Sequence, residues 1–177
     1  MSDGARGGTS CRSGSPRDND RAFDSVLSRE ETGMSSKDKG KFAGKHPRGT
    51  VPDEKIAIHL RGQIMEGGIP CAAAFAIAGR LGITPQEVGV TIDLLEAPID
   101  ECQLGLFGYG KGKKKVKAAE NVPPALHDAI MKSLVEGRLP CRSAWDLAEK
   151  SAVSRMDIAA ACETLGIRIS RCQLGSF

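Results

Sequence analysis

The stretch that decides the fold is PCAAAFAIAGRLGITPQE, residues 70–87, which recurs 70 positions later as PCRSAWDLAEKSAVSRMD, residues 140–157. Outward from it, residues 56–107 align with residues 126–177 without a gap, and 13 of these 52 aligned positions are identical. A fixed period of this kind marks a duplicated structural unit, so one fold must explain both halves.

Each copy predicts the same order of elements. Apolar residues recur at helical spacing from residue 52 until the glycines at 67–68, and again from residue 123 to Gly137. A short extended piece follows in each copy, because the residue before a proline is biased away from helix. The further predicted elements are second helices at about 72–81 and 142–151, third helices ending near 95 and 165, and strands at 99–104 and 169–174.

The start of each third helix carries a capping pattern. Thr84 stands at the N-cap position with Pro85 at the first helical position and Glu87 three residues after the cap. The second copy has Ser154 and Asp157 at the equivalent places. Both copies therefore predict a tight turn between the second and third helices.

The pattern Ala-x-x-x-Ala-x-x-x-Gly-Ile-Thr, built on Ala74, Ala78 and Gly82, places small residues where a third helix can cross the second closely. The second copy repeats it with Ala144, Ala148 and Ala152. Over residues 54–107 and 124–177 the sequence resembles the winged helix-turn-helix superfamily. The resemblance implies a mainly α fold with small β wings, in two tandem winged helix-turn-helix repeats. The repeated Cys-Gln-Leu-Gly-x-Phe ending is similar to that of small uncharacterised bacterial proteins of this type.

In that superfamily the third helix usually enters the DNA major groove. The resemblance then assigns to the groove the outer face of each third helix, with Gln86 reading adenine and Arg155 contacting guanine or phosphate. In the first repeat the rest of that face is apolar or acidic, which favours a protein partner there. In the second repeat the implied supporting basic residues are Arg142, Lys150 and Arg168.

Charge divides the chain into four parts. Residues 1–50 carry ten basic and seven acidic side chains, and the first repeat, 51–107, carries three and eight. The linker, 108–120, carries five basic side chains and one acidic side chain. The second repeat, 121–177, carries seven basic and six acidic side chains. Charge asymmetry on this scale indicates different partners for different parts.

Residues 1–50 are rich in Gly, Ser, Asp and Arg without apolar periodicity, which predicts a disordered polar and basic tail. Met34 offers an alternative start of translation. The N-terminus lacks a signal-peptide pattern and no run approaches the ~20 apolar residues that span a bilayer. We therefore expect a cytoplasmic protein without a membrane partner.

The linker is the most basic stretch, and two structures fit it: a wing tip or a flexible basic tether. Either one would contact DNA phosphates in a salt-dependent way that does not select sequence. A soluble spacer between two domains is the alternative. The basic residues of the linker are Lys111, Lys113, Lys114, Lys115 and Lys117.

Cysteines recur with the repeat: Cys71 and Cys102 are 31 residues apart, as are Cys141 and Cys172. Both members of a pair flank the same expected small sheet, so we expect each pair to lie close. These thiols are candidate ligands for zinc or an iron–sulfur centre, but the close Cys-x2–4-Cys spacing of zinc sites is missing. We expect buried core cysteines and no cofactor.

No set of residues in the sequence forms a catalytic constellation, and we expect no enzyme activity. The favoured hypothesis is a bacterial DNA-binding transcriptional regulator whose partner is double-stranded DNA. The alternative is a protein-interaction module that uses the acidic first repeat and carries a cysteine-based metal or redox site. Units of about 55 residues are small, so we also expect the repeats to pack against each other or, as a homodimer, against a second chain.

Overall fold

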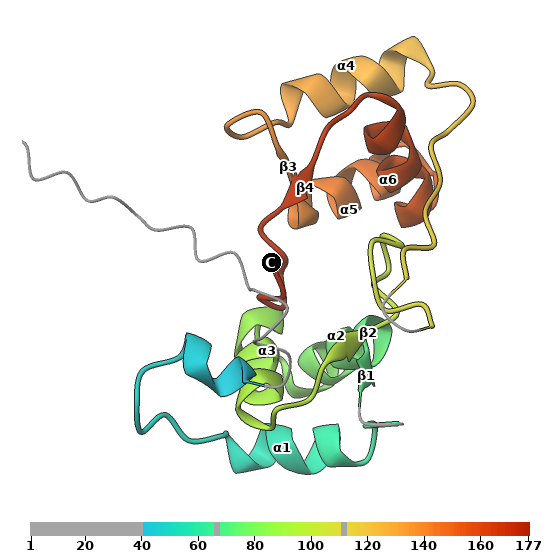
Figure 1. Cartoon of the computed structure of the whole chain (residues 1–177). Coiled ribbons are helices and arrows are strands. Elements are labelled where there is room, and N and C mark those ends of the chain that lie inside the picture. Colours follow the sequence, from blue (N-terminus) through green and yellow to red (C-terminus); the bar gives the residue numbers. More distant parts are fainter. Residues whose placement is uncertain (1–40, 66–67, 111–112) are drawn as a thin grey trace, which may run out of the picture. The chain divides into compact units, whose positions relative to one another are not determined.

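The computed structural model describes residues 41–65, 68–110 and 113–177, which all belong to one compact unit, Met34–Phe177. The fold is mainly helical with short strands, as the sequence predicts (Figure 1). After the 3-10 helix η2 (Phe42–Lys45), the first repeat contains α1 (Glu54–Arg61), β1 (Ile69–Pro70), α2 (Cys71–Leu81), α3 (Pro85–Leu94) and β2 (Ile99–Asp100). The second repeat contains α4 (Pro124–Lys132), β3 (Leu139–Pro140), α5 (Cys141–Lys150), α6 (Arg155–Thr164) and β4 (Ile169–Ser170).

Both capping predictions are confirmed. The Thr84 hydroxyl accepts from the Glu87 amide at 3.2 Å, and the Glu87 carboxylate accepts from the Thr84 amide at 2.8 Å. The pKa of the Glu87 carboxyl is lowered because the Thr84 hydroxyl, at 2.7 Å, and the Thr84 amide both donate to its charged form. Ser154 and Asp157 form the same reciprocal pair at the start of α6.

The first helix of each repeat is shorter than predicted. The chain leaves α1 at Arg61 and α4 at Lys132, and then makes a tight turn. The amide of Met65 donates to the Gly68 carbonyl at 2.8 Å, and that of Val135 donates to the Arg138 carbonyl at 2.9 Å. The last apolar residues of each predicted first helix therefore lie in a loop and not in a further helical turn.

The predicted long strands, 99–104 and 169–174, are corrected by the structure, because β2 and β4 contain two residues each. β1 pairs with β2 in parallel, Ile69 opposite Ile99, and β3 pairs with β4 in the same way. Each last strand ends at a left-handed residue, Glu101 with φ 47° or Arg171 with φ 52°. The chain then closes into loops at 102–107 and 172–177 instead of extending into a wing hairpin. In each loop the first amide donates to the carbonyl of the last residue, at 3.2 Å in both copies.

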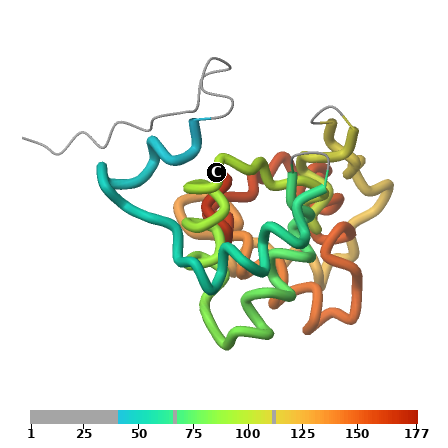
Figure 2. The backbone as a smooth tube through the Cα atoms, turned by 90° about the horizontal axis from the view of Figure 1, so that it is seen from below, coloured from blue at the N-terminus to red at the C-terminus, as the bar shows by residue number. Residues whose placement is uncertain are grey.

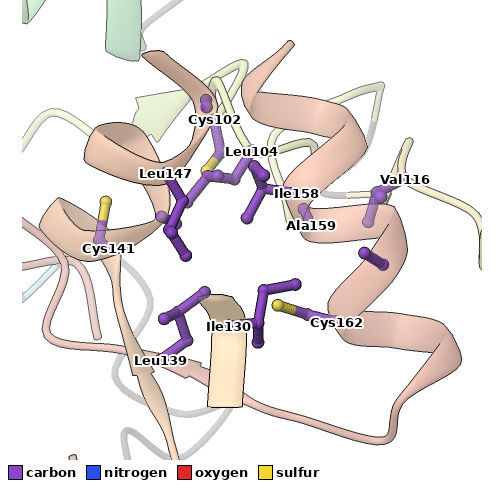
Figure 3. Packing of buried hydrophobic residues seen from close by; sticks show 13 residues of the cluster. Cys102, Leu104, Val116, Ile130, Leu139, Cys141, Leu147, Ile158, Ala159 and Cys162 are labelled. Atoms are coloured by element: carbon purple, nitrogen blue, oxygen red, sulfur yellow. The ribbon is translucent and has the colours of Figure 1, made fainter. Parts of the chain in front are cut away.

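These two loops are exchanged between the repeats. Leu174, from the end of the second repeat, is buried in the hydrophobic cluster of the first repeat with Leu60 and Val88. Cys102 and Leu104, from the end of the first repeat, are buried in the cluster of the second, near Leu147 and Ile158 (Figure 3). The prediction that the repeats pack against each other is therefore confirmed, and each repeat completes the core of the other.

Glycine in α3 admits the exchanged loop. A Cβ atom added to Gly89 would lie 2.1 Å from the Leu174 carbonyl oxygen, so the backbones meet closely there. Figures 1 and 2 both show the C-terminal segment beside α3. The equivalent residue of α6 is Ala159, which is buried in the second cluster.

Residues 1–40 of the predicted disordered tail lie outside the described residues. The described end of that tail departs from the prediction, because residues 42–45 form η2 against α3. The amides of Phe42 and Ala43 donate to the Glu96 carboxylate at 2.7 and 3.2 Å. Lys45 pairs with the buried Asp93 at 3.2 Å. The ordered part of the first repeat thus begins before residue 51.

Candidate nucleic-acid interface

The described start of the linker, residues 108–110, lies against the 102–107 loop. The backbone amide of Tyr109 donates to the Lys113 carbonyl at 3.0 Å. The Tyr109 hydroxyl donates to the Cys102 carbonyl at 2.9 Å. The predicted contact residue Lys111 lies outside the described residues. The described start of the linker is therefore tied to the same loop that enters the core of the second repeat.

The segment 113–119 is anchored along its length. Val116 is only 5% exposed, and its amide donates to the Gly105 carbonyl at 3.0 Å. The amide of Ala119 donates to the Ala160 carbonyl of α6 at 3.1 Å, and the Thr164 hydroxyl donates to the Ala119 carbonyl at 2.7 Å. This part of the linker is therefore not a free tether, which corrects one of the two structures that the sequence allows.

Anchoring at Val116 leaves the neighbouring lysines exposed in fixed positions. We call residues 113–117 the basic segment. Lys113 and Lys117 make no ion pair within the described part of the chain, and the Lys115 ammonium lies 5.0 Å from the centre of the Tyr109 ring. Lys114 differs, because its ammonium pairs with Glu163 of α6. The segment offers three cations that no carboxylate of the described residues neutralises.

The predicted basic residues of the second repeat lie in different surroundings. The Arg142 side chain is exposed but paired with Asp146, one turn later on α5, at 2.9 Å. Lys150 and Arg168 are exposed, the former at the end of α5 and the latter just before β4. These positions leave two further cations available to an anionic partner.

Arg155 is held by the protein itself. Its guanidinium carbon lies 3.4 Å from the centre of the Trp145 ring, and the guanidinium donates to the Gln103 side chain. Trp145 in turn contacts Phe75 with ring centres 4.2 Å apart. The residue is half-buried in these contacts, so its charge supports the contact between the repeats. The structure leaves Gln86, in contrast, exposed near the start of α3.

The helix faces that the resemblance assigns to the major groove are largely covered. On α3, Gly89 and Asp93 are buried beneath the 172–177 loop and η2. On α6, Ala159 is buried in the cluster that contains Leu104 and Val116, and Glu163 faces Lys114. Insertion of either face into a groove would require removal of these packed segments.

Of the four repeated cysteines, Cys71, Cys102 and Cys141 are buried, and Cys172 is partly buried. Cys71 and Cys172 pack in the hydrophobic cluster of the first repeat, and Cys102 and Cys141 in that of the second, so each core holds one thiol from each predicted pair. Burial raises the pKa of the Cys71 thiol to about 12, and the charges of the other three thiols act in the same direction. Among the described residues, no group of three or more His, Cys, Asp or Glu side chains is arranged to hold a metal ion.

The anchoring role of Val116 was missed in the sequence, although it had a signal. Val116 is the only apolar residue between Lys113 and Lys117, which is typical of a buried anchor in a polar segment. The pairing of Lys45 and His46 with Asp93 had no such signal, because the partners lie 48 and 47 residues apart.

Comparison with protein-family models, curated proteins and solved structures finds no match to this chain. In the part of the chain that the structure describes, every helix is too short or too polar to cross a membrane.

Proposed function

We propose that the protein is a DNA-binding regulator that holds double-stranded DNA through its phosphate backbone, with the basic segment as the main contact. The observation that carries the proposal is the anchored position of exposed, unneutralised lysines on both sides of the buried Val116. Fixed cations lose less conformational entropy on binding than cations on a flexible tether. Lys150 and Arg168 are candidates for further contacts.

We further propose that each repeat is related to the winged helix-turn-helix fold. Each repeat keeps two helices joined by a capped turn, and we propose that the 102–107 and 172–177 loops stand where a wing would lie. The loops serve the exchange between repeats instead of reaching DNA. Base reading by the covered faces of α3 and α6 is not part of the proposal, so binding depends on duplex charge more than on sequence.

A salt titration tests the proposal. Binding of a random-sequence duplex, followed by fluorescence anisotropy, should weaken with a slope of about −3 in log K against log salt, for three phosphate contacts. The test variant replaces Lys113, Lys115 and Lys117 by Gln, and we expect roughly ten- to a hundredfold weaker binding at 50 mM salt.

The matched control replaces Lys55, Arg61 and Arg80 by Gln, which removes the same charge from exposed positions of the first repeat. We expect the control to stay within about threefold of the parent, because overall charge acts more weakly than direct phosphate contacts. Equal weakening of both variants would reject the basic segment as the contact. Absence of duplex binding at low salt would reject DNA binding itself.

A second candidate function is supported by the surface of the first repeat. Its net charge is −5, and the apolar side chains of Val51, Ile58 and Met65 are 77%, 61% and 71% exposed. Exposed apolar residues on an acidic surface fit a basic protein partner. Ile58→Asp should leave DNA binding unchanged but abolish such an interaction, and sedimentation velocity detects whether the partner is a second copy.

A further inference from the structure

A pocket of about 320 Å³ lies between the two repeats, where α2, the start of α3, α5 and the 172–177 loop meet. Phe75 of α2, Pro85 at the first position of α3 and Gln173 of the loop line it together. Asp146 and Glu149 of α5 line it as well. The pocket therefore combines an aromatic ring, a side-chain amide and carboxylates.

In the second repeat an arginine fills the corresponding place. The Arg155 guanidinium carbon lies 3.4 Å from the centre of the Trp145 ring, and the guanidinium donates to the Gln103 side chain. A planar cation stacks well on an aromatic face, and its fixed N–H groups reach a neighbouring oxygen at the same time. A ring and a glutamine in this arrangement therefore select a guanidinium.

The first repeat has the ring and the glutamine without the cation. At the offset of 70 residues, the residues that correspond to Trp145, Arg155 and Gln103 are those that line the pocket: Phe75, Pro85 and Gln173.

The proline and the glutamine leave this place open to a ligand. Pro85 has no cationic side chain that could reach the Phe75 ring. Gln173 is partly buried, its side-chain nitrogen donates to the Cys141 thiol at 3.7 Å, and its side-chain oxygen accepts from no described residue. The pocket is therefore a guanidinium site that lacks an arginine of its own.

Charge in the pocket favours the same occupant. Arg142, which also lines the pocket, is paired with Asp146 at 2.9 Å. Arg155 is the remaining cation of the lining, and its guanidinium is already engaged by the Trp145 ring. The Glu149 carboxylate, in contrast, is exposed and makes no ion pair with the described residues. A cation in the pocket would gain this carboxylate as a partner.

We propose that this pocket binds the guanidinium group of an arginine side chain that a protein partner presents. The guanidinium lies against the Phe75 ring, donates to the Gln173 side-chain oxygen and pairs with the Glu149 carboxylate. The site shares no residue with the basic segment, so the proposal goes beyond DNA binding and stands without it.

A nuclear magnetic resonance titration of the full chain with N-acetyl-arginine amide tests this site. Trp145 is the only tryptophan of the sequence and lines the pocket, so its single indole N–H signal reports on binding. We expect saturable shifts with a dissociation constant in the millimolar range, because one side chain makes few contacts.

Two matched probes separate charge from shape. N-acetyl-citrulline amide has nearly the same shape without the charge and should bind at least roughly tenfold more weakly, because it loses both the ring contact of a cation and the ion pair. N-acetyl-lysine amide keeps the charge without the planar group and should bind at least roughly threefold more weakly.

Pro85→Arg is the decisive variant, because it introduces the residue that the second repeat has at this position. Its own guanidinium should fill the pocket and weaken binding of the arginine amide by more than about tenfold. The control Ala125→Arg adds the same charge at an exposed position of α4 and should bind as the parent does.

Glu149→Gln tests the carboxylate and should weaken binding by roughly two- to fivefold, the effect of one exposed ion pair. Its control, Glu120→Gln, removes the same charge from an exposed position of the linker and should bind as the parent does.

Circular dichroism establishes that each variant is folded. The proposal is overturned if the arginine amide does not bind saturably, if the citrulline amide binds equally well, or if folded Pro85→Arg binds like the parent. Tighter binding of N-acetyl-aspartate amide would also overturn it, because the pocket would then be an anion site formed by Arg155.

Discussion

The two repeats share every helix and strand but differ in how each third helix receives the loop of the other repeat. In α3, Gly89 lets the backbone of Leu174 approach closely, whereas α6 has Ala159 at the same position. Outside these contacts, α3 is covered by η2 and α6 by the segment 113–119. The comparison teaches that the duplicated unit preserved its internal helix packing, while each copy adapted to a different covering segment.

The largest expected effect comes from removal of an exchanged leucine. Leu174 and Leu104 are each 1% exposed, so replacement of either by Ala should lower the free energy of unfolding by about 3 kcal/mol. Because the loops are exchanged, hydrogen exchange should show that Leu174→Ala loosens α3 first and Leu104→Ala loosens α6 first. If each substitution instead loosened its own repeat, the loops would not be exchanged in solution.

Gly89→Ala should have the next largest effect. The added methyl group would meet the carbonyl oxygen and carbon of Leu174 at 2.1 and 2.7 Å, which forces the loop to shift. We expect a loss of about 2 kcal/mol in urea unfolding. The reciprocal Ala159→Gly adds no clash and should cost only about 1 kcal/mol through helix propensity. Equal losses in the two variants would remove the distinction between the helices.

The turn before the third helix also differs between the repeats, with a smaller expected effect on the free energy of unfolding. Gly82 ends α2 in the left-handed region with φ 66°, and Ala152 occupies the same region with φ 52°. Alanine is strained there by roughly 1–2 kcal/mol, and the greater unfolded-state entropy of glycine offsets part of this, so Ala152→Gly should raise the free energy of unfolding by about 0.5–1 kcal/mol. Gly82→Ala should lower it by a similar amount. Thermal melting measures both, and destabilisation by Ala152→Gly would contradict this explanation.

The smallest effect concerns the buried thiols. Burial raises the pKa of Cys71 from 9.0 to about 12, so the folded state resists ionisation that the unfolded state accepts. This contribution to stability is fully present below pH 9 and is lost as the pH rises from 9 towards 12. The loss from Cys71 is small at pH 9 and grows above it, and Cys71→Ala should remove that share of the pH dependence in urea unfolding. An unchanged dependence would place the Cys71 thiol in water.

Much of the fold follows from local sequence signals. The repeat, the capped starts of α3 and α6 and the alanines of α2 and α5 all predict helices that the structure contains. Capping and helical periodicity act over a few residues, so they can be recognised without the rest of the chain. The ends of α1 and α4 were predicted less well, because a tight turn and a further helical turn can bury the same apolar residues.

The candidate sites were only partly predictable. The lysines of the linker are plain in the sequence, but the contacts that fix them depend on Gly105 and Ala160, which come from different repeats. The pocket beside Pro85 is lined by residues between 75 and 173, and no local pattern connects them. Arg155 is a basic residue at the start of a third helix, as a DNA contact would be, yet Trp145 and Gln103 hold its side chain within the protein.

The sequence by itself determined the duplicated helical unit, its capped turn and the division of charge between the repeats. The tertiary structure alone decided that residues 102–107 and 172–177 change places, which buries Leu104 and Leu174 in opposite repeats. The physical reason is that helices and turns form from local signals, whereas the core that receives each loop is chosen by contacts between residues distant in the chain. Among these contacts are the close approach of Leu174 at Gly89, the anchor at Val116 and the pairing of Asp93 with Lys45.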